Sequence, residues 1–230
     1  MTESFVKLAA TAAGVAAISL YLNGKYHICK DLTHIYYLQR GIRHQDRLRR
    51  ENRIDIWRTF TENAAKLPDL DCVWYQEPGR NATTVHKYTW AAAHTRACQY
   101  AHWFLSNGVR PGDCVAFILQ NSADFVLAWL GLIAISCYPA MINYNLVGGA
   151  LVHCVKIAEC KIVLVDDDIK ERVLNNEHLL MLGVQIEVLD DTLKARVATM
   201  QTTSPGEEHR RGCDDQTKLA LRYTRLEFSI

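Results

Sequence analysis

Three side chains with metal-binding chemistry recur every fourth residue in one segment: His94, Cys98 and His102. If the segment is a helix, this spacing puts them on one face, and imidazole and thiolate are ligands that zinc prefers. No fourth ligand is evident nearby in the sequence. A helix face that is partly buried against the rest of the domain produces the same pattern, and we favour that interpretation.

Two further stretches carry groups that can bind ligands. Asp166–Asp168 end an apolar run, where carboxylates can hold Mg²⁺, but they also suit the N-cap of the next helix, which we favour. Ile142–Asn145 contributes amides and a phenol that could line a pocket, and turn chemistry explains it about as well. The sequence contains no G-x-G-x-x-G, Walker A, nucleophile-elbow, H-E-x-x-H or C-x-x-C motif.

The spacing of apolar residues predicts the elements that position these groups. Ile54–Leu67 has helical periodicity and ends before Pro68, and two β-type runs then predict a hairpin. Thr89 caps the next helix, Trp90–Ser106, and Asn107-Gly108 closes it.

Beyond that helix, strands and helices alternate. Short continuous apolar runs predict buried strands, and the longer segments between them predict helices, with Asn121 or Ser122 as a cap and Gly183 as a terminus. The expected strands are 114–120, 138–143, 161–167 and 184–190, with another starting at Lys218, and the expected helices are 121–135, 146–159 and 169–183. This alternation predicts an α/β fold with a layered parallel sheet and flanking helices.

Composition limits the function classes. The chain has 230 residues, 49% of them hydrophobic, which is enough for a sizeable core. A net charge of +1 gives no electrostatic case for nucleic acid. Most of the eight cysteines lie in apolar runs, which predicts reduced core thiols in a protein that faces the cytosol.

The N-terminal segment differs from the rest. Leu8–Leu22 is uninterruptedly apolar, though short for a bilayer crossing, and a basic region follows it. We favour a membrane anchor with the basic flank and the domain in the cytosol, because that flank obeys the positive-inside rule and attracts anionic headgroups. A signal peptide and a buried helix of the soluble domain remain open alternatives.

Several stretches together resemble one family. "GVRPGD", "NSADFVLAWLGL", "PAMINYNL" and "KIVLVDD" resemble the N-terminal subdomain of the AMP-forming acyl-CoA synthetases, and more narrowly the fatty-acid-transport-protein and very-long-chain acyl-CoA synthetase branch. The resemblance runs from about Ile54 to Thr224. One departure is Ser136-Cys137, where the branch usually has Gly-Ala.

The resemblance implies a chemistry and a site. Family members use ATP and Mg²⁺ to convert a fatty acid to an acyl-adenylate, then transfer the acyl group to CoA. A loop resembling Y-T-S-G-T-T-G-x-P-K holds the ATP phosphates through backbone N–H groups, hydroxyls and a lysine. Tyr223 and Thr224 match the start of this loop, but Arg225–Ile230 follows where small residues are expected. We therefore carry over no catalytic residue, and we expect no cofactor for this chain alone.

These observations predict five segments, which are a membrane anchor (1–23), a basic juxtamembrane segment (24–52), a partial AMP-binding-type α/β domain (53–198), a linker (199–217) and a truncated strand with a divergent tail (218–230). We expect a truncated, membrane-associated relative of long-chain and very-long-chain fatty acyl-CoA synthetases that is inactive alone. The alternative is a non-catalytic protein that binds acyl chains or a full-length relative. The expected partners are membrane lipids and, in the full-length family, fatty acid or acyl-CoA.

Overall fold

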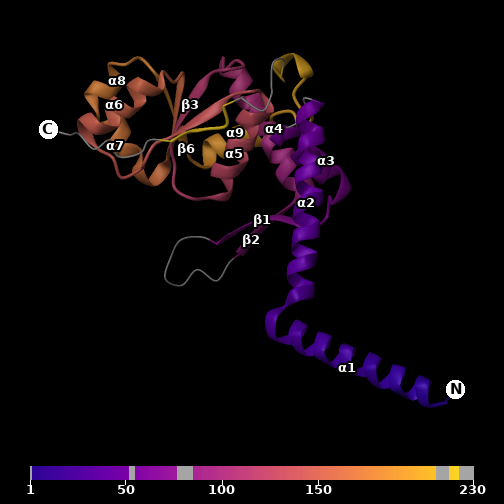
Figure 1. Cartoon of the computed structure of the whole chain (residues 1–230). Helices are drawn as coiled ribbons and strands as arrows, with labels where there is room; N and C mark the ends of the chain where they lie inside the picture. The colour runs from indigo at the N-terminus through magenta and orange to yellow at the C-terminus, as the bar shows by residue number, and fades with distance from the viewer. Residues whose placement is uncertain (1, 52–54, 77–84, 211–217, 223–230) are drawn as a thin grey trace. The chain divides into compact units, whose positions relative to one another are not determined.

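A computed structural model of the chain describes residues 2–51, 55–76, 85–210 and 218–222 (Figure 1). The chain divides into two compact units, residues 1–54 and residues 55–230.

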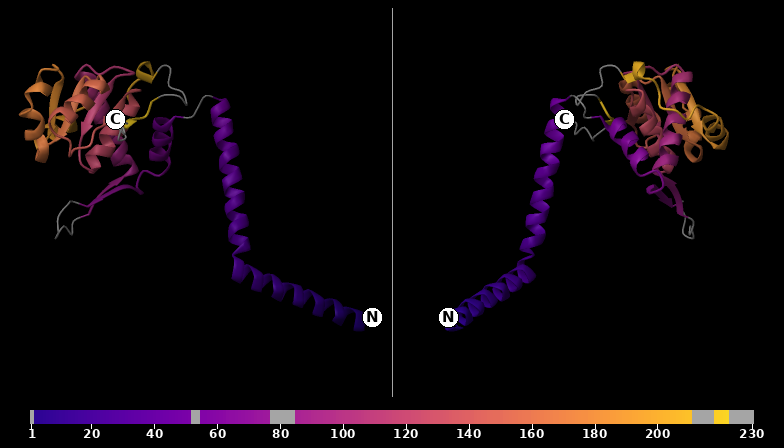
Figure 2. Two further views of the ribbon diagram at one scale, coloured as in Figure 1. Left: turned by 60° about the vertical axis from the view of Figure 1, so that its left-hand side comes forward. Right: turned by 90° about the vertical axis from the view of Figure 1, so that its right-hand side faces the viewer.

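The first unit consists of two helices, α1 (Thr2–Tyr26) and α2 (Ile28–Arg50), which meet at an angle (Figure 2). The break lies at His27, whose φ of 53° is left-handed and cannot continue a right-handed helix. The Asn23 side chain bridges the break, because its Oδ1 accepts a hydrogen bond of 2.7 Å from the backbone N–H of Cys29.

Within α1, the stretch Ser4–Tyr26 is long and apolar enough to cross a membrane, and none of it is buried. A signal sequence near an N-terminus meets the same criterion of length and composition. The predicted anchor therefore stays a prediction, and the basic segment behind it forms the helix α2.

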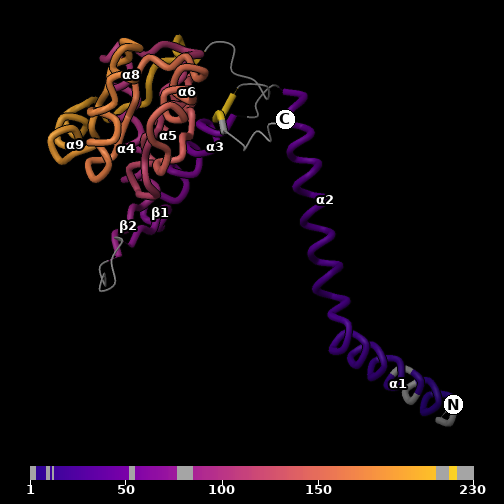
Figure 3. Tube along the Cα trace, turned by 90° about the vertical axis from the view of Figure 1, so that its left-hand side faces the viewer, coloured from indigo at the N-terminus to yellow at the C-terminus, as the bar shows by residue number. Residues whose placement is uncertain are grey.

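The second unit begins with a helix and a hairpin that pack beside the sheet. Asp55 caps α3 (Ile56–Lys66) by accepting a 2.9 Å hydrogen bond from Trp57 N, and the helix ends before Pro68 as predicted. The predicted hairpin is formed by β1 (Asp71–Gln76) and β2 (Val85–Thr89), which pair antiparallel and run side by side (Figure 3). The turn predicted between them lies outside the described residues.

The main sheet is parallel, with the strand order β6-β5-β3-β4-β7. Its strands are β3 (Cys114–Ile118), β4 (Tyr138–Met141), β5 (Ile162–Asp166), β6 (Gln185–Leu189) and β7 (Leu221–Arg222). The connecting helices are α4 (Trp90–Ser106), α5 (Ala123–Ala134), α6 (Gly148–Ala158), α7 (Lys170–Leu174), α8 (Glu177–Leu180) and α9 (Asp191–Ala198), with short 3-10 helices η1 (Asp167–Ile169) and η2 (Glu207–Arg210). The predicted α/β fold with a layered parallel sheet is confirmed.

Alternation along the central strands explains why the apolar runs are continuous. In β3, Val115 and Phe117 join the core formed with α3, α4, α5 and α9, whereas Ala116 and Ile118 join the core formed with α6, α7 and α8. Figure 1 shows these two groups of helices on opposite sides of the sheet. A strand covered on both faces has no polar side, which is why its sequence shows no period of two.

Local cap chemistry was largely predictable. Thr89 caps α4 by accepting a 3.2 Å hydrogen bond from Ala92 N, and Ser122 caps α5 by accepting a 3.1 Å bond from Phe125 N. Of the two cap candidates for α5, Ser122 is therefore the one used. Gly183 has a φ of +67° and lies in the turn between the end of α8 at Leu180 and the start of β6.

The single helix predicted over 169–183 is wrong. The segment instead forms η1, α7 and α8, with a break at Asn175-Asn176. Asn176 leaves the helical region, and its Oδ1 accepts a 3.2 Å hydrogen bond from Leu179 N, which starts a second helix. Asparagine competes with helix continuation through this kind of local bond. Helix α9, which was not predicted, is capped by Asp190.

Ser136, the position that departs from the family pattern, has a left-handed backbone with φ of 58°. Its carbonyl accepts a 2.9 Å hydrogen bond from Gly112 N, so the neighbouring loop helps to hold this conformation. A residue with a Cβ costs about 1 kcal/mol there, which glycine avoids.

We therefore expect Ser136→Gly to raise the free energy of unfolding by about 0.5–1 kcal/mol, the gain being reduced by the extra freedom of glycine in the unfolded chain. Thermal unfolding of the full chain measures this. Ser136→Ala is the matched control, since it removes the hydroxyl and keeps the Cβ. An equal gain in both variants would assign the effect to the hydroxyl rather than to the backbone.

Candidate functional site

The carboxyl edge of the sheet contains a small polar cleft. The strand order places β4 on one side of β3 and β5 on the other, so the loops after β3 and β5 leave in opposite directions and open a crevice between them. A cavity of about 350 Å³ lies there, and its lining residues come from the hairpin, from the segments that follow β3, β4 and β5, from the last residues of β5 and β6, and from α9. They are Tyr75, Gln120, Asn121, Ser122, Tyr144, Asp166, Asp167, Asp168, Leu189 and Lys194.

A side-chain hydrogen bond connects the end of β5 with the loop after β3 at this crevice. Asp166 Oδ2 accepts a 2.5 Å bond from the backbone N–H of Gln120, which lies two residues beyond the end of β3. The predicted capping role of Asp166 is wrong, because this residue occupies the N-cap position of η1 but makes no side-chain cap bond. Its carboxylate is instead directed across the sheet edge. Asp167 pairs with Lys170 at 2.8 Å.

Burial raises the pKa of Asp166 above its ordinary value, and the charge of Asp168 adds to the effect, whereas the hydrogen bond from Gln120 N opposes it. A carboxyl group with a raised pKa in the folded state binds protons more tightly there than in the unfolded chain. Its contribution to stability is fully present below the unfolded pKa, near 3.8, and is lost as pH rises through the folded pKa.

We therefore expect Asp166→Asn to become more stable relative to the natural chain as pH rises from about 4 to 7, because the amide keeps an acceptor oxygen and carries no charge. Urea unfolding of both proteins across this range gives the difference in unfolding free energy. A difference that moves in the opposite direction would mean that the bond from Gln120 N outweighs burial.

A polar cluster lies beside the cleft and fixes one of its walls. The Tyr100 hydroxyl donates a 2.6 Å hydrogen bond to Asp124 Oδ1, and Arg96 and Lys194 approach the same carboxylate at 3.7 Å and 3.9 Å. Burial, with the Asp124 charge, raises the pKa of Tyr100 well above its ordinary value, so the phenol stays protonated as the donor. Lys194 thus faces both this cluster and the cleft.

The stretch Ile142–Asn145 both forms a turn and lines the cleft, which are the two interpretations that the sequence left open. Asn143 Oδ1 accepts a 2.9 Å hydrogen bond from Asn145 N, which is local turn chemistry, and Tyr144 lines the cleft. The Tyr144 carbonyl accepts a 3.0 Å bond from Arg172.

The His94, Cys98 and His102 face of α4 is structural, as favoured from the sequence. His94 stacks on Trp57 with ring centroids 5.2 Å apart, and burial lowers its pKa. Cys98 is fully buried, and His102 Nε2 lies 2.9 Å from the Thr203 carbonyl oxygen. Among the residues that the structure describes, no group of three or more His, Cys, Asp or Glu side chains could hold a metal ion.

The seven cysteines within the described ranges are all free thiols, in agreement with the predicted reduced state. Burial raises the pKa of Cys114 and Cys137 to about 12. These two buried groups therefore remain neutral thiols at physiological pH.

The predicted nucleotide-loop residues Tyr223 and Thr224 lie outside the described residues. The strand that precedes them is present, since β7 pairs in parallel with β4 and the Arg222 backbone stands opposite Met141. The segment that leads into β7 is held by Trp129 of α5, whose Nε1 donates a 2.8 Å hydrogen bond to the Leu219 carbonyl. A strand in this segment is thus confirmed, although it begins at Leu221 rather than at Lys218, and it runs toward the same carboxyl edge as the cleft.

Sequence reasoning missed part of the cleft. Tyr75, Leu189 and Lys194 were not singled out, because they belong to a hairpin strand, a buried strand and an unpredicted helix. The cap residue Asp190 before an eight-residue segment with Leu193 and Val197 was the available signal for α9.

The fold is that of a doubly wound α/β domain with its candidate site at the switch point. The family model for AMP-binding enzymes matches residues 60–224, most of the chain, and the chain belongs to that family. The match ends at Thr224, so Arg225–Ile230 lies outside it.

Two curated relatives and one solved structure define the likeness. The chain is 36% identical over 160 residues to isopenicillin N epimerase component 1 of Hapsidospora chrysogena, covering 70% of this chain and 25% of that protein. It is 32% identical over 178 residues to the very long-chain fatty acid transport protein of Cochliobolus heterostrophus, covering 75% and 26%. The chain therefore spans about a quarter of the length of these relatives.

The crystal structure of the N-terminal domain of FACL13 from Mycobacterium tuberculosis matches with a TM-score of 0.62 at 19% identity, covering 74% of this chain and 42% of that chain. At this identity the match shows the fold alone. It agrees with the predicted assignment to the N-terminal part of an adenylate-forming enzyme.

Proposed function

We propose that this chain forms the N-terminal α/β subdomain of a fatty acyl-CoA synthetase that acts on long-chain or very-long-chain fatty acids. The family match over residues 60–224 is the observation that carries the proposal, and the fatty acid named for the Cochliobolus heterostrophus relative suggests the substrate. The reaction would use ATP and Mg²⁺ to form an acyl-adenylate, from which CoA takes the acyl group.

In this proposal, Tyr223 and Thr224 begin the loop that holds the ATP phosphates. Adenylation requires groups that neutralise the phosphate charge in the transition state. Small residues let backbone N–H groups approach phosphates closely, whereas Arg225–Ile230 presents long and bulky side chains at that place. We therefore propose that the 230-residue chain does not form acyl-adenylate by itself.

A chimaera tests the subdomain assignment. Residues 60–224 replace the corresponding stretch of the Cochliobolus heterostrophus transport protein, and acyl-CoA formation is measured with ATP, CoA and fatty acids of increasing chain length. We expect thioester formation with the longer acids by the chimaera and none by the 230-residue chain. A folded but inactive chimaera would contradict the subdomain assignment, and turnover by the chain alone would contradict the role given to Arg225–Ile230.

The substrate class needs its own comparison, since the Hapsidospora chrysogena relative is named for isopenicillin N. Isopenicillin N is therefore offered to the same chimaera in place of the fatty acid. Activity with isopenicillin N and none with fatty acids would overturn the proposed acyl substrate.

We also propose that α1 anchors the protein in a membrane, with the basic segment and the α/β domain that follow it in the cytosol. The apolar span Ser4–Tyr26 and the basic residues behind it support this topology. Resistance of the membrane-bound protein to alkaline carbonate, with protease access to the domain from the cytosolic side only, is the expected result. Cleavage of the chain after α1 would instead identify a signal sequence.

A second candidate function is association with a full-length synthetase. Within the described residues β7 pairs with β4 alone, and an edge strand is a surface on which another chain can pair. Co-purification of the tagged chain with a full-length relative would support this role, and a monomeric chain without that partner would count against it.

A further inference from the structure

Helix α2 presents an apolar stripe that is exposed within the first unit. Ile28, Leu32, Ile35 and Ile42 follow one another at intervals of four, three and seven residues, so they lie along one side of the helix. Each of these four side chains is between 42% and 60% exposed, and α2 has no buried residue. A stripe of this kind needs an apolar surface to rest on.

A row of arginines lies beside the stripe. Arg40, Arg43, Arg47 and Arg50 are spaced by three, four and three residues, which places them in a row about a quarter of a turn from the stripe at 100° per residue. All four are exposed. In total, α2 contains six lysine and arginine residues but only two acidic residues, Asp31 and Asp46.

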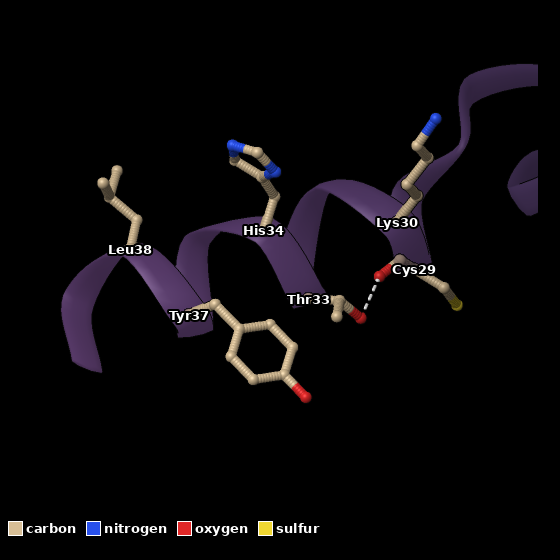
Figure 4. A pocket seen from close by; sticks show the side chains of 6 residues that line it. All are labelled: Cys29, Lys30, Thr33, His34, Tyr37 and Leu38. Carbon is tan, nitrogen blue, oxygen red and sulfur yellow. Dashed lines mark hydrogen bonds between the residues drawn. The ribbon is translucent and has the colours of Figure 1, made fainter. Parts of the chain in front are cut away.

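The opposite side of α2 carries mainly polar groups, together with Tyr37 and Leu48. Figure 4 shows Lys30, Thr33, His34 and Tyr37, which lie about half a turn from the stripe. The Thr33 hydroxyl donates a 2.7 Å hydrogen bond to the Cys29 carbonyl, so it is satisfied within the helix. The hollow on this side is lined by α2 alone, and one helix face cannot enclose a ligand.

We propose that α2 lies in the plane of an anionic membrane surface, with its isoleucine and leucine stripe in the acyl boundary and its arginine row on the lipid phosphates and carboxylates. Charge complementarity favours an anionic bilayer as the surface that α2 rests on, because helices with a net positive charge and an apolar face bind anionic bilayers. The inference rests on the proposed function to the extent that α1 brings α2 to a bilayer. The left-handed residue His27 then separates an inserted helix from one that lies on the surface.

Hydrogen exchange of the full chain distinguishes α2 from α1. Most of the stability of a helix in a protein comes from packing its apolar face, so amides of 28–50 exchange quickly unless a surface covers the stripe. Exchange is measured in phosphatidylcholine vesicles and in vesicles with about one third phosphatidylserine, each at low salt and at about 0.5 M salt, where surface charges are screened. We expect protection of 28–50 in the anionic vesicles at low salt, and its loss at high salt.

A charge variant and a matched control test the arginine row. Arg40→Gln/Arg43→Gln/Arg47→Gln is expected to lower protection of 28–50 in anionic vesicles by about 100-fold, since each basic side chain near an anionic surface contributes roughly a factor of five. Arg58→Gln/Lys66→Gln/Lys156→Gln removes the same charge from exposed positions of the second unit, and it is expected to leave that protection unchanged.

The outcomes separate the two levels of the proposal. Fast exchange of 28–50 in every vesicle, with 4–26 protected, overturns the α2 surface and leaves the α1 anchor standing. Protection of 28–50 that is equal in neutral vesicles, or present without vesicles, also overturns it, because the occupant is then not an anionic surface. Fast exchange of 4–26 together with salt-sensitive protection of 28–50 supports the α2 surface and contradicts the anchor.

Discussion

Arg210→Met is expected to lower the free energy of unfolding by about 3–5 kcal/mol, the range seen when one partner of a buried ion pair is removed. Arg210 is 8% exposed, and its guanidinium donates hydrogen bonds of 2.9 Å and 3.0 Å to the carbonyls of Ile133 and Ala134 at the end of α5. It also pairs with Asp55, the cap residue of α3. Removal leaves a carboxylate and two carbonyl groups without this donor.

The pair can be tested as a double-mutant cycle by urea unfolding of the full chain. Asp55→Asn keeps an oxygen for the α3 cap and removes the charge, so it leaves Arg210 as an uncompensated buried cation. We expect the free energy of unfolding of the double variant to be close to that of either single variant. Each charge destabilises the fold only when its partner is absent. Additive losses would show that the two residues act independently.

A surface pair provides the control for this cycle. Arg58 lies 3.5 Å from Glu62 with its side chain 53% exposed. Because solvent screens such a pair, Arg58→Met is expected to cost at most about 0.5 kcal/mol. A similar loss at both arginines would mean that the effect reflects arginine removal in general rather than burial.

Gly131→Ala is expected to lower the free energy of unfolding by about 2–3 kcal/mol. Gly131 lies in α5 where it crosses α4, and an added Cβ would stand 2.8 Å from Tyr100 Cβ and 2.9 Å from the Ala97 carbonyl oxygen. These atoms belong to or directly join the backbone of α4, so no side-chain rotation relieves the contact. The two helices must separate, which the higher helix propensity of alanine offsets only in part.

Gly149→Ala is the matched control. Gly149 is also helical, in α6, and a Cβ added there would meet no atom of the described residues within 4 Å. Alanine is therefore expected to stabilise the chain there by up to about 1 kcal/mol. Thermal unfolding of both variants gives the comparison. A stabilising Gly131→Ala would show that α4 and α5 approach each other less closely than these distances indicate.

Much of the fold followed from local chemistry in the sequence. Thr89 and Ser122 were predictable as caps because a hydroxyl before an apolar helix satisfies free backbone N–H groups within three residues. The helix over 169–183 was predicted wrongly because its apolar spacing is regular, whereas the two consecutive asparagines interrupt it. Periodicity alone does not weigh such competing hydrogen bonds.

The candidate site was less predictable. Asp166 was noticed as a carboxylate at a strand end, but its bond to Gln120 N depends on β5 lying next to β3 rather than next to β4. Both strands are buried on both faces, so their sequences contain no signal of which neighbour each one takes. The contribution of Lys194 depends on α9, which packs against α4.

By itself, the sequence determined the alternation of strands and helices, the caps, the apolar and basic character of the two N-terminal helices, and the family. These properties depend on residues close together in the chain. Only the tertiary structure decided that Arg210 meets Asp55, that Gln120 meets Asp166, and that Gly131 must stay free of a side chain. Such contacts join residues far apart in the chain, and they exist only once strand order and helix crossing bring those residues together.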